Sequence, residues 1–252
     1  MADELTKAYI NLFTVLRNLE DLCELDEESR LLVRDKNVSV QFIVKDGPRA
    51  LVVFRDGKCT VQSGKGKCDI KLYFKSPGHL NNMFDGKANP IPLKGFTRLG
   101  FLKNEFTKLT DRLVYYLKPT EELLKNPGYF KINTYLTLYT AIFALAEIAN
   151  HDRKGKVCAS RIPDGIVSVS VLNGGPSINI NVKSGLLEAA KGPGQSPRSY
   201  MIFSSLDVAN GILSGRIDTY SAIGAGDLQV KGFIPMLDNI NKILALVPSY
   251  LS

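Results

Sequence analysis

Residue types that carry out catalysis are few in this chain. The two histidines are His79, at the start of a short predicted helix, and His151, just past the end of a longer one. We interpret His79 as a capping or solvent-facing side chain and His151 as a cation that complements a helix dipole. A catalytic partner brought close by the fold is the alternative. Because neither paired carboxylates nor a metal-ligand cluster recurs along the sequence, we predict no enzyme activity, no metal and no cofactor.

Glycine-rich turns are the other candidates for chemistry, since backbone N–H groups in such turns can bind phosphate. The turn at residues 64–67 (Gly-Lys-Gly-Lys) lacks the longer Walker spacing and precedes a predicted strand, where a phosphate loop needs a helix. Its counterpart at residues 192–195 (Gly-Pro-Gly-Gln) has no lysine. The stretch at residues 224–227 is too short for a dinucleotide fingerprint. We interpret the turn at residues 64–67 as a plain hairpin.

Cysteine usage and the N-terminus bear on the compartment. The four cysteines form no Cys-x-x-Cys pair and have no histidine at zinc spacing. Met1 leads into Asp3 and Glu4, so no apolar signal segment is visible. We predict a cytoplasmic protein with reduced thiols.

The formal net charge of +7 raises the question of anionic partners. The lysines are scattered, and the densest group is Lys65, Lys67 and Lys71. We interpret them as a solvated surface, with peripheral contact to anionic membranes as the alternative. Nucleic acid is not expected as a partner, because tryptophan is absent and no aromatic residues alternate with basic ones.

One apolar stretch, residues 132–149, reaches the lower limit of a membrane span and carries a single charge, Glu147. Its counterpart in the first half, residues 9–22, contains Arg17, Glu20 and Asp21 and cannot cross a bilayer. Corresponding helices of two repeated halves should occupy the same position in the fold. We therefore predict a buried amphipathic helix over a transmembrane one.

The two halves of the sequence repeat each other. Tyr9 aligns with Tyr135 at an offset of 126 residues, and Gly86 aligns with Gly215 at an offset of 129. The order of the matches holds while the offset drifts, and so long a period indicates two copies of a whole domain. We place copy one at residues 1–120 and copy two at residues 121–252.

Hydrophobic periodicity predicts the same elements in each copy. Copy one is expected to have helices at residues 5–22, 76–85 and 104–117, and strands near residues 38–44, 49–55, 58–62, 69–74 and 96–99. Copy two is expected to have helices at residues 132–148, 205–213 and 234–246, and strands near residues 165–172, 177–182, 186–190, 200–203 and 227–230. Residues 26–30 are expected to be a charged connector. Short hairpins make each five-stranded sheet mainly antiparallel, so the fold class is α+β, with helices covering the sheet of each tandem repeat.

What recurs between the copies is apolar. Inward-facing positions on the sheet and the terminal helix predict either a packed core or a lined cavity, and periodicity does not separate the two. The candidate ligand-binding residues of copy one are Phe42, Leu72, Phe74, Leu80, Met83, Phe84, Phe101, Phe106 and Leu109. Those of copy two are Val169, Met201, Phe203, Ile212, Leu213, Ile240 and Leu244. Copy one is richer in Phe and Met, so we favour it as the binding copy.

Two runs in copy two carry a family resemblance. Residues 203–218 read Phe-Ser-Ser-Leu-Asp-Val-Ala-Asn-Gly-Ile-Leu-Ser-Gly-Arg-Ile-Asp, and residues 226–232 read Gly-Asp-Leu-Gln-Val-Lys-Gly. They resemble the strand, short helix ending in Gly-Lys or Gly-Arg, and Gly-x-Leu-x-Val-x-Gly strand of the sterol carrier protein-2-like domain. Copy one has Gly86-Lys87 and aligns Gly95 with the first glycine of the second run, but residues 99–101 then replace the Val-Lys-Gly turn.

The resemblance implies two tandem lipid-binding α+β domains. The leading hypothesis is a non-enzymatic carrier of a fatty acyl chain, a sterol-like lipid or another aliphatic molecule. The alternative is a structural or protein-interaction module whose cavities are filled, and an enzyme acting on lipid is a third reading. The sequence predicts neither the ligand's identity nor the oligomeric state.

Overall fold

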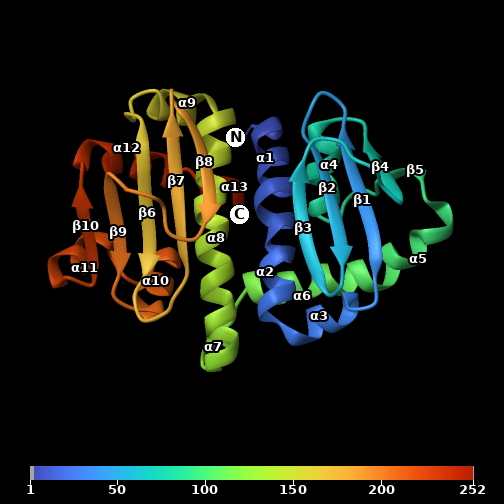
Figure 1. The fold of residues 1–252 in the computed structure, drawn as a ribbon, viewed down its shortest axis with the longest axis horizontal. Coiled ribbons are helices and arrows are strands. Elements are labelled where there is room, and N and C mark those ends of the chain that lie inside the picture. Colours follow the sequence, from blue (N-terminus) through green and yellow to red (C-terminus); the bar gives the residue numbers. More distant parts are fainter. Residues whose placement is uncertain (1–2, 252) are drawn as a thin grey trace. The chain divides into compact units, whose positions relative to one another are not determined.

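The computed structural model describes residues 3–251, and the chain divides into two compact units, Met1–Ile132 and Asn133–Ser252 (Figure 1). Helix α7 (Glu121–Leu124) and the first turns of α8 (Pro127–His151) belong to unit 1. The predicted boundary after residue 120 therefore lies before these helices, in the segment that connects the two sheets.

Unit 1 opens with a long helical stretch, continues through four strands, a short helix and a fifth strand, and closes with a second helical stretch. The first stretch consists of α1 (Glu4–Ile10), the π-helical turn η1 (Asn11–Val15), the 3-10 turn η2 (Leu16–Asn18), α2 (Leu19–Leu25) and α3 (Glu27–Val33). Then come β1 (Asn37–Val44), β2 (Arg49–Arg55), β3 (Lys58–Ser63), β4 (Ile70–Phe74), α4 (Pro77–Phe84) and β5 (Ile91–Lys94). The closing stretch consists of η3 (Phe96–Arg98), α5 (Leu99–Phe101), the π-helical turn η4 (Leu102–Phe106) and α6 (Thr107–Leu117).

Side-chain caps explain where several of these helices begin. Ser76 accepts a hydrogen bond from the N–H of His79 and Pro77 occupies the first turn of α4, as the sequence predicts. Asp26 caps α3 in the same way, accepting from the N–H of Ser29. The predicted connector at residues 26–30 is therefore wrong, because Asp26 and the acidic first turn that follows it start a helix.

The sheet of unit 1 has the strand order β3-β2-β1-β4-β5. β1 pairs antiparallel with β2 and parallel with β4, and the pairs β2–β3 and β4–β5 are antiparallel. This confirms an α+β fold with a mainly antiparallel five-stranded sheet. One face is apolar and fully buried along Val40, Phe42 and Val44 and their cross-strand partners, so the core lies on this face.

The loop between β3 and β4 corrects the reading of residues 64–67. It is not a hairpin, because β4 pairs with β1 and the chain must cross from one side of β1 to the other. The buried side chain of Gln41 holds the crossing: its Nε2 donates to the carbonyls of Ala50 and Gly64, and its Oε1 accepts from the N–H of Gly66.

Unit 2 repeats the arrangement after α8. Its elements are α9 (Arg153–Ala159), β6 (Gly165–Val171), β7 (Ser177–Lys183), β8 (Leu186–Lys191), β9 (Ser199–Phe203), α10 (Leu206–Leu213), α11 (Thr219–Ala225), β10 (Leu228–Gly232), α12 (Ile234–Leu244) and α13 (Pro248–Leu251). The strand order β10-β9-β6-β7-β8 matches that of unit 1, with β6 and β9 parallel at the centre. The two sheets thus have the same topology, as a repeat of whole domains requires.

Helix α8 is long and apolar enough to cross a membrane by length and composition alone. Most of its most apolar window is buried, as in the core helix of a globular unit. A helix of this kind is weak evidence for a membrane span, and the buried helix remains our interpretation.

The fifth strand of unit 1 differs from the prediction. β5 covers residues 91–94, whereas the predicted strand at residues 96–99 begins as the 3-10 turn η3. Gly95 has a φ of 87° and turns the chain out of the sheet, as Gly232 does with a φ of 94°. Gly95 is therefore equivalent to Gly232 and not to Gly226. In this alignment Leu-Lys-Gly-Phe at residues 93–96 matches Val-Lys-Gly-Phe at residues 230–233, and helix α11 is an insertion of unit 2.

Gly232 should be much less tolerant of substitution than Gly226, although both have left-handed backbones. A Cβ at residue 232 would lie 2.1 Å from the carbonyl oxygen of Arg198, while a Cβ at residue 226 meets nothing within 4 Å. Gly226→Ala should cost about 1–2 kcal/mol for its backbone conformation. Gly232→Ala should cost clearly more and displace β10 from β9. Chemical denaturation of both variants tests this, and equal losses would contradict the close approach.

One buried polar residue recurs in the two units, contrary to the expectation that only apolar positions recur. Asn81 on α4 accepts from the side chain of Asn11 and donates to the backbone carbonyl of Glu4. Asn210 occupies the same place on α10 and donates to the side chains of Asn133 and Thr134. In each unit this asparagine fastens the short helix to the first long helix.

Candidate functional site

Five phenylalanines of unit 1 meet on the buried face of the sheet. Phe54 lies 5.3 Å from Phe101 and 6.2 Å from Phe106 between ring centroids, and Phe42 lies 6.2 Å from Phe74 and 6.4 Å from Phe106. These separations are those of attractive aromatic pairs. Phe42, Phe54 and Phe74 come from β1, β2 and β4, and Phe101 and Phe106 come from the closing helical stretch. We call these five residues the phenylalanine cluster.

A groove of about 280 Å³ opens at one end of the phenylalanine cluster. Its lining is Lys36, Val38, Thr97, Arg98, Gly100, Phe101, Asn104 and Glu105. Phe101 belongs to both the groove and the cluster, so the groove borders the aromatic core at this residue. Lys36 and Arg98 place two cations at its rim, where Lys36 contacts Glu105 at 2.7 Å and Arg98 contacts Asp69 at 2.8 Å.

These ion pairs hold the acidic groups of the rim in their charged form. The hydrogen bond from Lys36 is the largest influence on Glu105 and lowers the pKa of its carboxyl. Burial would raise the pKa of Asp69, but hydrogen bonds from Ser39 and the charge of Arg98 outweigh it and lower this pKa too. The rim therefore carries paired charges of both signs around an apolar floor.

The backbone next to the groove is irregular. η4 is a π-helical turn, and Phe106 is its last residue. Such turns insert an extra residue into a helix and are frequent at functional sites. Gly100, on the helical turn just before it, lines the groove, and a Cβ there would meet nothing within 4 Å.

The structure brings together only part of the candidate set of copy one. Phe42, Phe74, Phe101 and Phe106 lie in the phenylalanine cluster, and Leu72 is buried beside Phe42 as its partner across β1 and β4. Leu80 and Leu109 are fully buried on α4 and α6. Met83 and Phe84, at the end of α4, are only half-buried. The sequence analysis missed one member of the cluster, Phe54, although it lies in a predicted strand.

In unit 2 the equivalent space is mainly aliphatic. Val169 pairs with Met201 across β6 and β9, and Phe203 pairs with Leu228 across β9 and β10. Val169 stands where unit 1 has Phe42, and Val182 stands where it has Phe54. Ile240 is fully buried on α12, while Ile212, Leu213 and Leu244 are half-buried. Ligand binding by these residues stays a prediction in both units.

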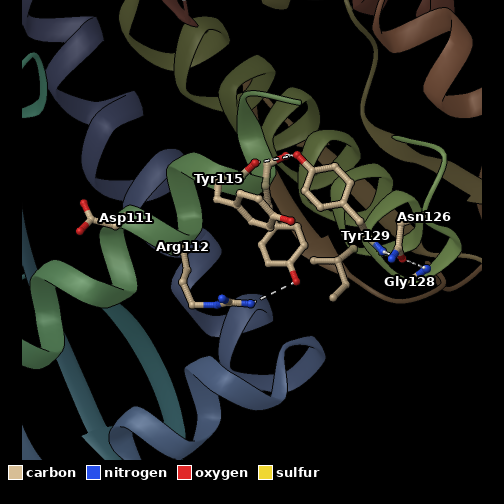
Figure 2. Close-up of a pocket in the computed structure, with 8 residues that line it drawn as sticks. Asp111, Arg112, Tyr115, Asn126, Gly128 and Tyr129 are labelled. Carbon is tan, nitrogen blue, oxygen red and sulfur yellow. Dashed lines mark hydrogen bonds between the residues drawn. The ribbon is translucent and has the colours of Figure 1, made fainter. Parts of the chain in front are cut away.

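A second hollow in unit 1 has a volume of about 520 Å³ and lies where α6 ends and α8 begins. Three tyrosines form its wall (Figure 2): the ring of Tyr129 lies 5.0 Å from Tyr115 and 5.1 Å from Tyr116, and the Tyr129 hydroxyl donates to the Tyr115 carbonyl at 2.6 Å. The rings contact one another and so leave no slot between them for a ligand. Asp111 lines the hollow too, but its side chain points away from the tyrosines (Figure 2).

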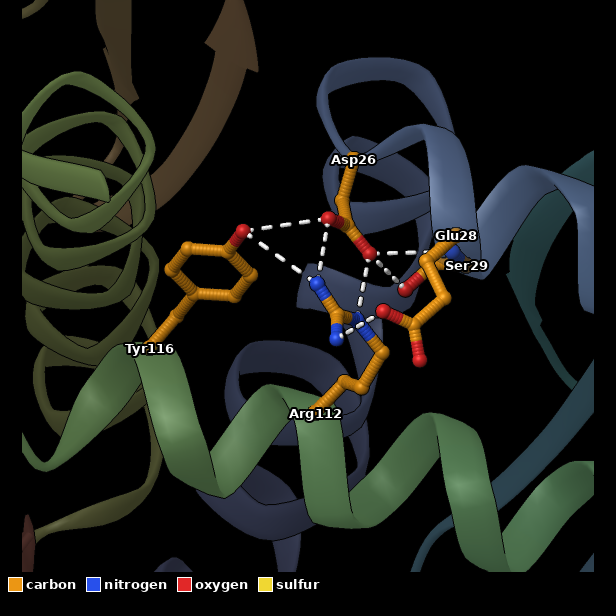
Figure 3. A network of polar contacts seen from close by, with 5 residues as sticks. All are labelled: Asp26, Glu28, Ser29, Arg112 and Tyr116. Atoms are coloured by element: carbon orange, nitrogen blue, oxygen red, sulfur yellow. Dashed lines mark hydrogen bonds and ion pairs between the residues drawn. The ribbon is translucent and has the colours of Figure 1, made fainter. Parts of the chain in front are cut away.

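Arg112, at the edge of this hollow, is occupied by an internal network (Figure 3). Its Nε and one terminal nitrogen contact the two oxygens of Asp26 at 2.6 and 2.7 Å, and its other terminal nitrogen contacts Glu28. The Tyr116 hydroxyl donates to Asp26 at 3.0 Å. We call Arg112, Asp26 and Tyr116 the arginine clamp, because they fasten α6 to the first turn of α3.

The pKa values fit a structural role for the clamp. Burial would raise the pKa of Asp26, but hydrogen bonds from Arg112, Ser29 and Tyr116 outweigh it and hold the pKa below its usual value. Burial, and then the nearby charge of Asp26, raise the pKa of Tyr116 to about 12. Each group thus keeps its ordinary charge state at neutral pH, and the cation of Arg112 is already neutralised. The clamp offers no reactive group.

Both histidines make local contacts. His79 Nδ1 accepts from the N–H of Lys75 and its Nε2 lies 2.9 Å from the carbonyl oxygen of Asn89, so the ring bridges two backbone segments. His151 lies 3.4 Å from Glu147 one helical turn earlier. No group of three His, Cys, Asp or Glu side chains in the described part of the chain is placed to hold a metal ion.

The tyrosine wall and the clamp were not predicted. Tyr116 falls within the predicted helix at residues 104–117, and Tyr129 falls before the predicted helix that starts at residue 132. Tyr115, Tyr116 and Tyr129 lie close together in the sequence, which is compatible with a contact between their rings. Sequence separation alone, however, does not indicate which aromatic rings meet.

Comparison with known proteins gives matches at the level of structure alone. No family model matches the chain, and no curated protein does so either. A solved UbiJ-SCP2 ubiquinone synthesis protein is 17% identical and matches 41% of this chain and 88% of its own, with a TM-score of 0.33. The sterol carrier protein domain 2 of Helicoverpa armigera is 20% identical and matches 49% of this chain and 93% of its own, with a TM-score of 0.35.

Palmitated SCP2L2 from Aedes aegypti is 14% identical and matches 41% of this chain and 90% of its own, with a TM-score of 0.33. Each of these matches spans less than half of the chain and most of the solved domain. Several of the matched structures are sterol carrier protein 2 domains, the family that the sequence resembles.

Proposed function

We propose that this protein is a non-enzymatic, cytoplasmic binder of an aliphatic ligand such as a fatty acyl chain, and that unit 1 holds the ligand in the groove beside the phenylalanine cluster. One observation carries the proposal: the groove has Phe101 as part of its wall, and the ring of Phe101 contacts Phe54 of the aromatic core. The sequence resemblance to lipid-binding domains supports the same ligand class.

The chemistry of the groove suits an amphipathic molecule. An aliphatic chain would lie against Val38 and Phe101, and a carboxylate head group would compete with Glu105 for Lys36 or with Asp69 for Arg98 at the rim. Removing each methylene from water contributes about 0.8 kcal/mol before the loss of chain entropy. A few buried methylenes and one ion pair thus suffice for measurable binding.

The size of the groove limits how much chain it accepts as it stands. Its volume of about 280 Å³ is just below the range of about 300–1,000 Å³ usual for small-molecule sites. A longer chain therefore requires the rings of Phe101 and Phe106 to swing away from Phe54. Phe106 is half-buried and ends the π-helical turn, which makes this the part of the cluster best placed to move.

Gly100→Phe is expected to block the site without disturbing the fold. Gly100 lines the groove and a Cβ there meets nothing within 4 Å, so a new ring can be accommodated at the groove. We expect its affinity for a fluorescent fatty acid to fall at least about tenfold, the loss of roughly 1.4 kcal/mol of contact. Gly224→Phe, at an equally open helical position in unit 2, is the matched control and should bind as the wild type does.

Thermal melting of both variants checks that they remain folded. Binding by Gly100→Phe with unchanged affinity would place the ligand outside the groove. The competing function, a structural or protein-interaction module, is favoured by the ring contacts that already fill the space above the sheet. Absence of saturable binding to the wild type would decide for that module.

A further inference from the structure

Each unit exposes a phenylalanine at the same corner of its sheet. The edge strand runs into the sequence Lys-Gly-Phe in both units: Lys94 ends β5 and is followed by Gly95-Phe96, and Lys231-Gly232 end β10 and are followed by Phe233. Phe96 is 64% exposed and Phe233 is 42% exposed. We call these two tripeptides the Lys-Gly-Phe corners.

The fold explains the glycines but not the phenylalanines. A Cβ at residue 95 would lie 2.5 Å from the carbonyl oxygen of Asp69, and a Cβ at residue 232 would lie 2.1 Å from that of Arg198. Both positions also have left-handed backbones, so glycine is required. The ring of Phe96 is largely exposed to water, and that of Phe233 is partly exposed beside the guanidinium of Arg198. Single exposed apolar residues are ordinary on protein surfaces, but here the same one recurs in two otherwise diverged copies.

The surroundings of both corners are apolar and basic. Leu93 precedes the first corner and Ile234 follows the second, and both are exposed. Arg98 lies two residues beyond Phe96, and the guanidinium of Arg198 lies 5.3 Å from the ring centre of Phe233. With Lys94 and Lys231, each corner has two basic residues near its aromatic ring, and Arg98 among them is paired with Asp69. This pattern matches the anionic interface of a bilayer, where rings enter the headgroup region and basic residues face the lipid charge.

We infer that the Lys-Gly-Phe corners are membrane-contact sites that insert Phe96 and Phe233 into the surface of anionic bilayers. The net charge of +7 favours such a partner over a neutral surface. The inference deepens the proposed function, because Thr97 and Arg98, which follow the first corner directly, line the groove. An aliphatic ligand that leaves a membrane at this corner would meet the groove at once.

Tryptophan insertion gives the direct test, since the chain has no tryptophan of its own. Phe96→Trp and Phe233→Trp each introduce a single reporter whose emission shifts to the blue on entering lipid. The probe is vesicles of phosphatidylglycerol and phosphatidylcholine in equal parts. Leu186→Trp, at a position that is also 64% exposed, is the matched control in a hairpin away from the corner of its unit. We expect a shift at residues 96 and 233 and none at residue 186.

Loss of the rings gives the second measurement. Phe96→Gln and Phe233→Gln should each weaken vesicle binding by about tenfold, as expected for one buried phenylalanine, and high salt should weaken it further. A shift at one corner only would overturn the inference for the other. It falls altogether if neither reporter shifts, if residue 186 shifts equally, or if the glutamine variants bind like the wild type.

Ligand titration keeps this inference separate from the proposed function. The glutamine variants should bind the fluorescent fatty acid in solution as the wild type does, because neither ring lines the groove. Vesicle binding without fatty-acid binding would support the Lys-Gly-Phe corners as membrane-contact sites and contradict ligand binding in the groove. Fatty-acid binding without vesicle binding would support a ligand-binding site in the protein and contradict membrane contact at the corners.

Discussion

Phe54→Ala is expected to lower the free energy of unfolding by about 3–5 kcal/mol, the usual cost of removing a large aromatic side chain from a core. Phe54 is fully buried and contacts Phe101 and Phe106 at the centre of the phenylalanine cluster. The loss combines the apolar surface no longer buried with the cavity that the neighbouring rings fail to fill. Urea denaturation, followed by a spectroscopic signal from unit 1, measures this loss of stability.

Phe96→Ala is the matched control, because it deletes the same atoms from a largely exposed position of the same unit. Its effect should stay within about 0.5 kcal/mol, as for ordinary surface substitutions. A loss below about 1 kcal/mol for Phe54→Ala would mean that Phe101 and Phe106 close the space. Such a small loss of stability would be an independent sign that the rings of Phe101 and Phe106 are mobile.

Arg112→Met is expected to destabilise the protein by about 3 kcal/mol at neutral pH, since it leaves the buried carboxylate of Asp26 without its cation. Methionine preserves much of the aliphatic stem of arginine. The expected loss of stability therefore comes from breaking the arginine clamp. The control is Lys242→Met, which breaks an ion pair with Asp238 of similar length on the exposed face of α12. That exposed pair should contribute at most about 1 kcal/mol.

The pH dependence of the Arg112→Met effect follows from the lowered pKa of Asp26 in the folded protein. A group whose pKa is lowered on folding stabilises the fold above its unfolded pKa, and this stabilisation is lost as the pH falls through the folded pKa. The gap between wild type and variant should therefore be complete at neutral pH and narrow below the ordinary aspartate pKa of about 3.9. A gap that stays constant down to acid pH would show that Arg112 acts through packing alone.

The sequence predicted the α+β class and the tandem repeat because both depend on periodic apolar patterns and turn residues. Ser76-Pro77 and the left-handed glycines Gly86 and Gly215 act locally, and each does what the pattern indicates. The fifth strand of copy one was misplaced for an equally physical reason. Gly95 and Gly226 look alike in sequence, but only contact with the neighbouring strand shows that Gly95 closes a strand and does not open one.

The candidate site was predictable only in part. Alternation along β1 and β4 indicates that Phe42 and Phe74 face inward, and the sheet makes them neighbours. Nothing in the pattern states that Phe101 and Phe106 reach Phe54, since that contact depends on the π-helical turn η4 and on where α5 begins. The groove is lined by residues from β1, the segment before it and the closing helical stretch, and only the packing of these elements brings them together.

The parallel pair at the centre of each sheet has a consequence for the order of folding. β1, β2 and β3 are joined by tight turns, one of them at Asp56-Gly57, so their antiparallel pairs close over a few residues at little entropic cost. β4 reaches β1 only after the chain has passed beyond β3 and crossed back. Contacts of higher sequence separation form more slowly. In each unit the three-stranded meander is therefore expected to be the early nucleus, and the strand that leads to the Lys-Gly-Phe corner is added late.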